Sequence, residues 1–231
     1  MKLPSKIALT VAVVAGMTAA AQAQISFTGS PYTQNANSFA GTAVTVPAGW
    51  SYAFSGTATY NGVGTGISAT GGAWAYGLAG DNSFGALRSG TPGNITLAVN
   101  FTNNTGSTLT DLVISFNYEQ WRFANTSGWD LSGTGGLAGV AAVNSADFVG
   151  SAIGVNGTPT STPIAITLSG LSIVNGANFG LSWLTTDVLG ADNGVALDDF
   201  TLASVPEPSV YVLLGVGLLF CGQRFLRRRR T

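Results

Sequence analysis

The segment NITLAVNFT, residues 94–102, alternates apolar and polar side chains with a period of two. The apolar side chains of this segment are Ile95, Leu97, Val99 and Phe101. In an extended chain they all point to one face, so the pattern predicts a β-strand with one buried side. Residues 109–123 repeat the pattern, and the polar run 103–107 between the two segments is typical of a turn. We therefore expect these two strands to form a hairpin.

The same alternation recurs through the rest of the chain between residues 24 and 204, and no amphipathic pattern of helix length interrupts it. Further strands are expected at Trp50–Phe54, Ala73–Leu78, Phe84–Arg88, Pro163–Leu168, Asn178–Leu184 and Val195–Ala203. Residues 126–162 are rich in Gly, Ala and Ser, and we expect loops there with one or two edge strands. Short strands separated by polar turns predict an all-β domain, an antiparallel β-sandwich of jelly-roll type over residues 24–204.

The amino-acid composition limits the kinds of catalytic and metal site that this domain could contain. The 231 residues include 32 glycines, 45% hydrophobic residues and only 8% charged residues, which is too apolar for a disordered chain. The chain has no histidine, and its one cysteine, Cys221, lies in an apolar tail. An internal disulfide is therefore excluded, and His-based triads and zinc sites lack their usual ligands. We expect the protein not to be an enzyme.

The charges are segregated along the chain. Residues 24–204 contain nine acidic residues against Arg88 and Arg122, which gives a net charge of −7. The segment from residue 205 onward contains five arginines against Glu207, which gives +4. An acidic domain repels phosphate backbones, so nucleic acid is not an expected partner.

Residues 1–23 have the order of a secretory signal peptide. Lys2 and Lys6 precede the apolar run Ile7–Ala15, and Ala21-Gln22-Ala23 supplies small residues around a cleavage point. The alternative is a buried N-terminal helix, which would not need this order of charge, apolar run and small residues. We expect export through the Sec route.

The C-terminal segment has the features of a single membrane anchor. Residues 209–223 are apolar apart from their borders, and at about 1.5 Å per residue they span roughly 22 Å, against about 30 Å for a bilayer core. Snorkelling side chains would extend the transmembrane helix to about residue 226. The cluster Arg227, Arg228, Arg229 and Arg230 is a stop-transfer signal that would stay in the cytoplasm. The inner-membrane-tethered precursor would then hold its domain on the far side of the membrane.

Val205-Pro206-Glu207-Pro208, followed by the apolar run and the terminal arginines, resembles a PEP-CTERM sorting signal over residues 205–231. The resemblance implies a Gram-negative bacterium with an exopolysaccharide system, and a membrane exosortase that removes the tail near Pro-Glu-Pro. Two prolines also favour an extended backbone that a protease could grip outside the membrane. The alternative is a stiff linker before an ordinary anchor.

The domain is similar to carbohydrate-binding-type β-sandwiches that accompany this kind of tail. The segments that carry the resemblance are Ala86–Gly90, Asn100–Gly106, Tyr118–Arg122 and Gly194–Phe200. The resemblance implies the fold rather than an activity.

Three groups of residues are candidates for a site. Asp187, Asp192 and Asp198 are candidate ligands of a structural Ca²⁺ ion, because hard cations bind several oxygens from one loop. Their spacing does not match an EF-hand, and acids that form turns before a last strand are the alternative. Trp121 and Trp129 flank polar residues and are expected to form a surface pair that contacts a ligand, although most tryptophans belong to the core. Trp183 is expected in the core.

The third group is a pair of carboxylates. Glu119 with Asp130 or Asp147 would suit glycosidase chemistry only if the two groups flanked one cleft. The favoured interpretation is that Glu119 pairs with Arg122 or Arg88, the only cations of residues 24–204.

Taken together, these patterns predict an exported, non-enzymatic protein of the cell surface or the biofilm matrix, processed by an exosortase and associated with exopolysaccharide. A carbohydrate-binding adhesin is the first alternative, and a secreted glycan-active hydrolase is the second.

Overall fold

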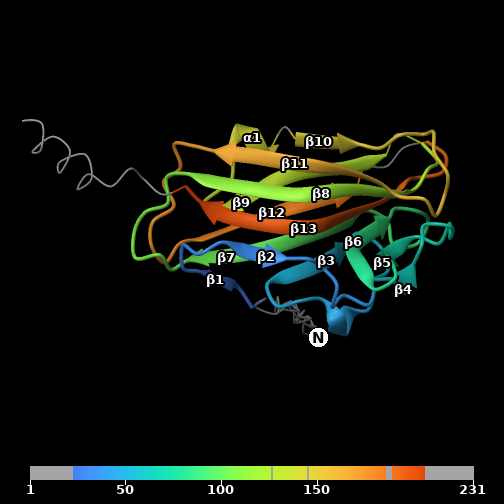
Figure 1. Ribbon diagram of the computed structural model, residues 1–231, viewed down its shortest axis with the longest axis horizontal. Helices are drawn as coiled ribbons and strands as arrows, with labels where there is room; N and C mark the ends of the chain where they lie inside the picture. Colours follow the sequence, from blue (N-terminus) through green and yellow to red (C-terminus); the bar gives the residue numbers. More distant parts are fainter. Residues whose placement is uncertain (1–22, 126, 145, 186–188, 206–231) are drawn as a thin grey trace, which may run out of the picture.

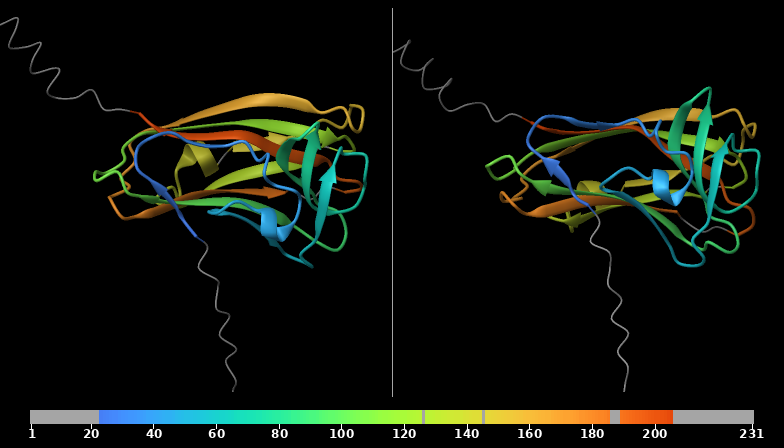
Figure 2. Two further views of the ribbon diagram at one scale, coloured as in Figure 1. Left: turned by 60° about the horizontal axis from the view of Figure 1, so that its bottom comes forward. Right: turned by 90° about the horizontal axis from the view of Figure 1, so that it is seen from below.

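The computed structural model describes residues 23–125, 127–144, 146–185 and 189–205. Two β-sheets lie face to face and enclose one core between them (Figures 1 and 2). The predicted all-β sandwich is confirmed. All of the predicted signal peptide except its last residue, Ala23, and the predicted membrane anchor lie outside the described residues. In the part of the chain that the structure describes, no helix is long and apolar enough to cross a membrane.

The first sheet has six strands in the order β1-β7-β12-β9-β10, and β3 also pairs with β7. Its strands are β1 (Ile25–Phe27), β3 (Trp50–Phe54), β7 (Ile95–Asn103), β9 (Gly128–Gly135), β10 (Ala146–Val149) and β12 (Asn178–Thr185). All of its pairings are antiparallel except the parallel pair β1 and β7. We call this sheet A.

The second sheet, sheet B, has seven strands in the order β11-β8-β13-β6-β5-β4, and β2 also pairs with β13. Its strands are β2 (Tyr32–Gln34), β4 (Tyr60–Gly64), β5 (Gly72–Leu78), β6 (Asp81–Leu87), β8 (Leu112–Arg122), β11 (Thr160–Leu168) and β13 (Gly194–Ser204). Among the described residues there are two short helices, the 3-10 helix η1 (Ala43–Thr45) and α1 (Ala141–Asn144).

The expected hairpin between the two clearest strands is wrong. β7 belongs to sheet A and β8 belongs to sheet B, so they lie on opposite sides of the core instead of pairing edge to edge. Both strands alternate buried and half-buried residues along their length, as the sequence predicts. Alternation reports which face of a strand is buried, and it does not report whether that face belongs to the same sheet as the next strand.

The region 126–162 is more regular than its composition indicates. β9 lies inside sheet A between β12 and β10, where we expected only edge strands. β10 does end the sheet, and α1 contacts β9 and β11 and places Val143 in the core. Gly and Ser are tolerated in β9 because its neighbours on both sides supply the pairing.

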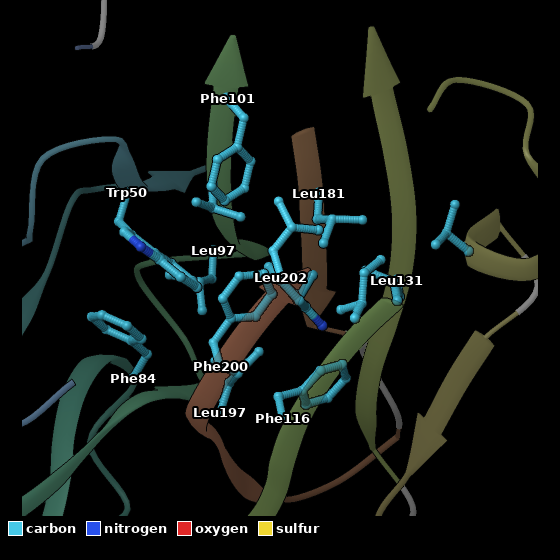
Figure 3. Packing of buried hydrophobic residues seen from close by; sticks show 14 of the residues in the cluster. Trp50, Phe84, Leu97, Phe101, Phe116, Leu131, Leu181, Leu197, Phe200 and Leu202 are labelled. Carbon is cyan, nitrogen blue, oxygen red and sulfur yellow. The ribbon is translucent and has the colours of Figure 1, made fainter. Parts of the chain in front are cut away.

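Aromatic rings from both sheets fill the core (Figure 3). Trp183 is fully buried, as the sequence predicts, and its ring lies 6.0 Å from that of Trp50 and 5.7 Å from that of Phe116. Phe200 from β13 meets Trp50 edge-on at 5.2 Å. Such edge-on and offset contacts stabilise a core beyond the area that they bury.

Candidate functional site

The junction between the domain and the C-terminal segment is defined by hydrogen bonds up to the last described residue. The Ser204 hydroxyl donates to the Gly29 carbonyl at 3.1 Å, and the Val205 N–H donates to the Asp111 carbonyl at 3.4 Å. A pocket of about 360 Å³ lies beside this exit. Its lining residues are Thr28, Gly29, Thr105, Ser107, Thr108, Leu109, Thr110, Asp111, Ser204 and Val205. The residue after Val205 is the first proline of Pro-Glu-Pro, so no spacer separates the sandwich from this element.

The outer face of sheet B carries an acidic group, which we call the acidic face and define as Asp81, Glu119, Asp198 and Asp199. Glu119 points outward because its neighbour Tyr118 packs in the core. β13 has a register shift between Asp198 and Thr201, and Asp199 has φ of 49°. Asp tolerates this left-handed conformation better than most residues, so consecutive acids suit the bulge.

Hydrogen bonds order the bulge. The Asp199 N–H donates to Asp198 Oδ1 at 2.8 Å, and Asn117 Nδ2 donates to Asp199 Oδ2 at 3.0 Å. Burial raises the pKa of Asp198 to about 7, and the charges of Asp199, Glu119 and Asp81 add to this rise, while the N–H of Asp199 opposes it. This carboxyl therefore changes its charge near neutral pH.

The Glu119 carboxylate binds an indole. Trp121 Nε1 donates to Glu119 Oε2 at 2.8 Å, whereas the Arg122 guanidinium donates to the Ile67 carbonyl at 3.3 Å. Burial raises the pKa of Glu119, and hydrogen bonds from Trp121 and Ser83 oppose this rise. The expected partner of Glu119 was an arginine, and the contact that the structure shows is to Trp121.

Three aromatic rings stack beside the acidic face, and we call them the outer ladder: Trp74, Tyr76 and Trp121. Tyr76 lies between the two indoles, 5.9 Å from each, with interplanar angles of 6° and 16°. The chain around β4 covers the ladder, because Gly64 abuts the Trp74 ring and Gly66 abuts Trp121. Trp74 Nε1 donates to the Thr70 carbonyl of the same segment at 3.0 Å.

The expectation that Trp121 and Trp129 form a surface pair is wrong. Trp121 is 4% exposed in the outer ladder, and Trp129 is 1% exposed in the core between the sheets. The two residues belong to different sheets. Their polar sequence neighbours do not expose them, because segments distant in sequence cover both rings.

The candidate calcium ligands do not form one cluster in the described structure. Asp187 lies outside the described residues. Asp192 precedes β13, whereas Asp198 lies within this strand, four residues beyond its first residue, Gly194. Because strand residues advance about 3.3 Å each, the two aspartates are separated along the strand direction. Residues 23–205, without the gaps given above, contain no group of three or more acidic, Cys or His side chains suited to a metal ion. A calcium site that includes Asp187 stays a prediction.

The carboxylate pair considered for glycoside hydrolysis is also wrong. Asp130 flanks the buried Trp129 and Leu131 and therefore points away from the core on sheet A, whereas Glu119 points away from it on sheet B. Asp147 lies opposite Asp130 in the β9–β10 register. Burial raises the pKa of Asp130, and the charge of Asp147 adds to this rise. Glu119 and these two acids lie on opposite outer faces, so they do not flank one cleft.

The comparisons with known structures match domains of low sequence identity. The K1 cleaved adhesin domain of Lys-gingipain from Porphyromonas gingivalis W83 is 12% identical, with a TM-score of 0.42, covering 77% of this chain and 100% of that one. The K3 domain is 14% identical, with a TM-score of 0.39 and coverages of 69% and 94%. An isomalto-dextranase from Arthrobacter globiformis T6, complexed with panose, is 12% identical, with a TM-score of 0.35 and coverages of 77% and 24%. No curated protein matches the chain.

The family comparison matches the segment that follows the junction. Residues 204–230 match the model of the PEP-CTERM protein-sorting motif. The match begins at Ser204, the last residue of β13, and includes Val205, Pro206, Glu207 and Pro208. The chain thus carries a PEP-CTERM sorting motif, which indicates an exported protein that an exosortase processes and sorts to the cell surface.

Proposed function

We propose that this chain is a non-enzymatic protein of the cell surface or extracellular matrix, retained with exopolysaccharide after an exosortase has removed its tail. The observation that carries the proposal is the junction, where the sorting motif directly follows the paired strand β13. The precursor would be exported through Sec and held in the inner membrane by residues 209–226. Processing would then release a folded domain that needs no further rearrangement.

The character of the domain supports a structural role. The carboxylates considered for hydrolysis lie on opposite faces, and the tryptophans considered for sugar stacking are buried. The adhesin alternative therefore loses its proposed contact pair, and the hydrolase alternative loses its proposed acid and nucleophile. The net charge of −7 would keep released copies soluble among hydrated polymers.

Processing is tested in the native host by replacing Pro206-Glu207-Pro208 with three alanines. We expect the uncleaved protein to accumulate in the membrane, while the conservative control Val210→Leu is processed normally. Mass spectrometry of the mature protein gives both cleavage positions. Unchanged processing and location of the alanine variant would disprove the sorting role.

Retention in the matrix is tested in a strain that lacks exopolysaccharide. We expect the processed protein to move from the cell-associated fraction into the medium, with its processing unchanged. If the cell-associated fraction of the processed protein does not change in this strain, the association with exopolysaccharide is refuted. Turnover of a host polysaccharide that Glu119→Gln abolishes would favour the hydrolase instead.

A further inference from the structure

We propose that processed copies of this chain pair antiparallel through the free edge of β11, and that tethering two copies to one membrane prevents this pairing. β11 ends sheet B and pairs only with β8 within the described chain. It has nine residues, none of them charged, whereas the other strands with one free edge, β1, β2, β3, β4 and β10, have three to five. Figure 1 shows β11 along the upper margin of its sheet. Such an edge is a template for another strand.

Two hydrogen bonds identify the backbone groups that face outward from β11. The Val205 N–H donates to the Asp111 carbonyl, so Asp111 points toward β13, and the Leu171 N–H donates to the Thr110 carbonyl, so Thr110 points the other way. Successive residues of a strand direct their N–H and C=O groups to opposite sides. Even-numbered residues of β8 therefore bond to β11, and in the observed register their partners are the even-numbered residues of β11.

The odd-numbered residues of β11 consequently present their N–H and C=O groups at the free edge. They are Ser161, Pro163, Ala165 and Thr167, and all four are exposed. Pro163 supports this assignment, because a proline has no N–H and is tolerated in a sheet where that position faces away from the ladder. The edge offers three donors and four acceptors.

This pattern is self-complementary when a two-fold axis passes beside Ala165. Ala165 then faces Ala165 of the second copy, and the two exchange a pair of N–H···O bonds. The Thr167 N–H donates to the carbonyl of Pro163 in the second copy, and symmetry repeats this bond. Between residues 163 and 167 the only donor that this four-bond register lacks is the missing N–H of Pro163, once in each copy. An isologous contact of this kind closes as a dimer.

The charge distribution favours the same contact. Two domains with a net charge of −7 repel each other over most orientations. β11 brings together only Thr, Ser, Pro, Ala, Ile and Leu side chains, so the strands meet along an uncharged strip. The contact is small, and the high local concentration of a matrix would compensate for its modest affinity.

The direction of β11 determines which copies are able to pair. β8 is antiparallel to both β11 and β13, so β11 runs in the direction of β13, toward the junction at Val205. An antiparallel β11 pair places the two junctions at opposite ends of the dimer. This step rests on the proposed function: two precursors anchored in one membrane point the same way, and removal of the tails frees them to pair.

Cysteine cross-linking of the processed protein tests the register. At a hydrogen-bonded antiparallel position the two Cα atoms lie about 5.5 Å apart, within the range that a disulfide spans. Under mild copper-catalysed oxidation by air, Ala165→Cys should give a covalent dimer. Ser115→Cys is the matched control, because Ser115 lies beside Ala165 on the same face, one strand inward. No dimer with Ala165→Cys, or equal dimer with both variants, would overturn the proposal.

Light scattering of the processed protein measures the affinity. Ala165→Pro removes only a donor at the free edge, so the circular dichroism spectrum of the domain should not change. The dissociation constant of the dimer should increase at least tenfold. A wild-type protein that stays monomeric at millimolar concentration would overturn the proposal. If Ala165→Pro fails to fold, the cross-linking experiment with Ala165→Cys tests the pairing in its place.

The last experiment tests the effect of tethering in cells that make an uncleaved protein, in which alanines replace Pro206–Pro208. This protein also carries Ala165→Cys as the cross-linking site and Cys221→Ser to remove the native cysteine. We expect no cross-link in intact membranes and a cross-link after solubilisation in detergent. A cross-link within intact membranes would refute the tethering step. Fractionation scores the location separately, so a failure of sorting is distinguishable from a failure of pairing.

Discussion

The inner core and the outer ladder use the same residue types on the two faces of sheet B. In the inner core, Trp183 packs against Trp50 and Phe200, so both sheets enclose it. In the outer ladder, Trp121 and its neighbours have the sheet on one side and the single segment around β4 on the other. The inner cluster therefore depends on the whole sandwich, and the outer cluster depends on one covering segment.

The indole nitrogens differ in the same way. In the outer ladder, Trp74 and Trp121 both donate hydrogen bonds, to the Thr70 carbonyl and to Glu119. In the inner core, Trp50 Nε1 donates to the Tyr32 hydroxyl at 2.9 Å, but the Nε1 atoms of Trp129 and Trp183 have no partner among the described residues. Trp129 and Trp183 therefore contribute apolar area alone, whereas Trp74 and Trp121 also connect a loop and a carboxylate to the sheet. The difference teaches that burial alone does not define the role of a tryptophan.

Truncation of one ring in each cluster tests this comparison most strongly. Trp183→Ala should lower the free energy of unfolding by about 4 kcal/mol, because neighbours from two sheets cannot collapse into the space. Trp121→Ala should cost less, about 3 kcal/mol, because the covering segment is able to settle. Urea denaturation measures both values. A larger loss for Trp121→Ala would show that the outer ladder is the more rigid cluster.

The covering segment gives the next largest effect. Gly66 has φ of 81°, and an added Cβ would lie 2.2 Å from the Trp121 carbonyl oxygen; Gly62 has φ of 80° with open space around it. Gly62→Ala should cost about 1 kcal/mol for the left-handed backbone. Gly66→Ala should cost about 1–3 kcal/mol more because the segment must move. Thermal unfolding compares the two, and equal losses would mean that the contact with Trp121 contributes nothing.

The sequence predicted strands well wherever one face is buried. β3 has the predicted bounds, and β7, β8, β12 and β13 differ from the predicted ones by a few residues at their ends. β1 and β2 were missed because three residues are too short to display a period, and β4 was missed because its sequence YNGVG contains two glycines and no apolar alternation. β9 was not recognised as an interior strand, because its Gly and Ser residues are kept in place by pairing rather than by propensity.

The site could be predicted only where its signal is local. The sorting motif is one continuous segment, so its residues were identified directly. The segment that covers Trp121 contacts it at Gly66, more than fifty residues earlier, and no property of the residues beside Trp121 reports that contact. The acidic face likewise joins Asp81, Glu119 and Asp198 through strand order, which alternation does not specify.

The acidic face gives the smallest effect, a dependence of stability on pH. The pKa of Asp198 is about 7 in the folded protein and near 4 in the unfolded chain, so folding favours the protonated carboxyl. This contribution is complete below about pH 4 and is lost as the pH rises through 7. Between pH 5 and pH 8 the stability should fall by about 1 kcal/mol, a value reduced because water partly screens the group. In Asp198→Asn the fall should disappear.

Glu119→Gln sharpens this test because it removes one negative neighbour of Asp198 without removing the side chain. The pKa of Asp198 should decrease, so the loss of stability should still begin near pH 4 but should end at lower pH and be smaller. Carbon NMR titration of the Asp198 carboxyl measures the midpoint directly. Asp130→Asn, on the outer face of sheet A, is the matched control and should leave that midpoint unchanged. A midpoint that moves in the control but not in Glu119→Gln would mean that the acidic face is not an electrostatic unit, and that burial alone sets the pKa of Asp198.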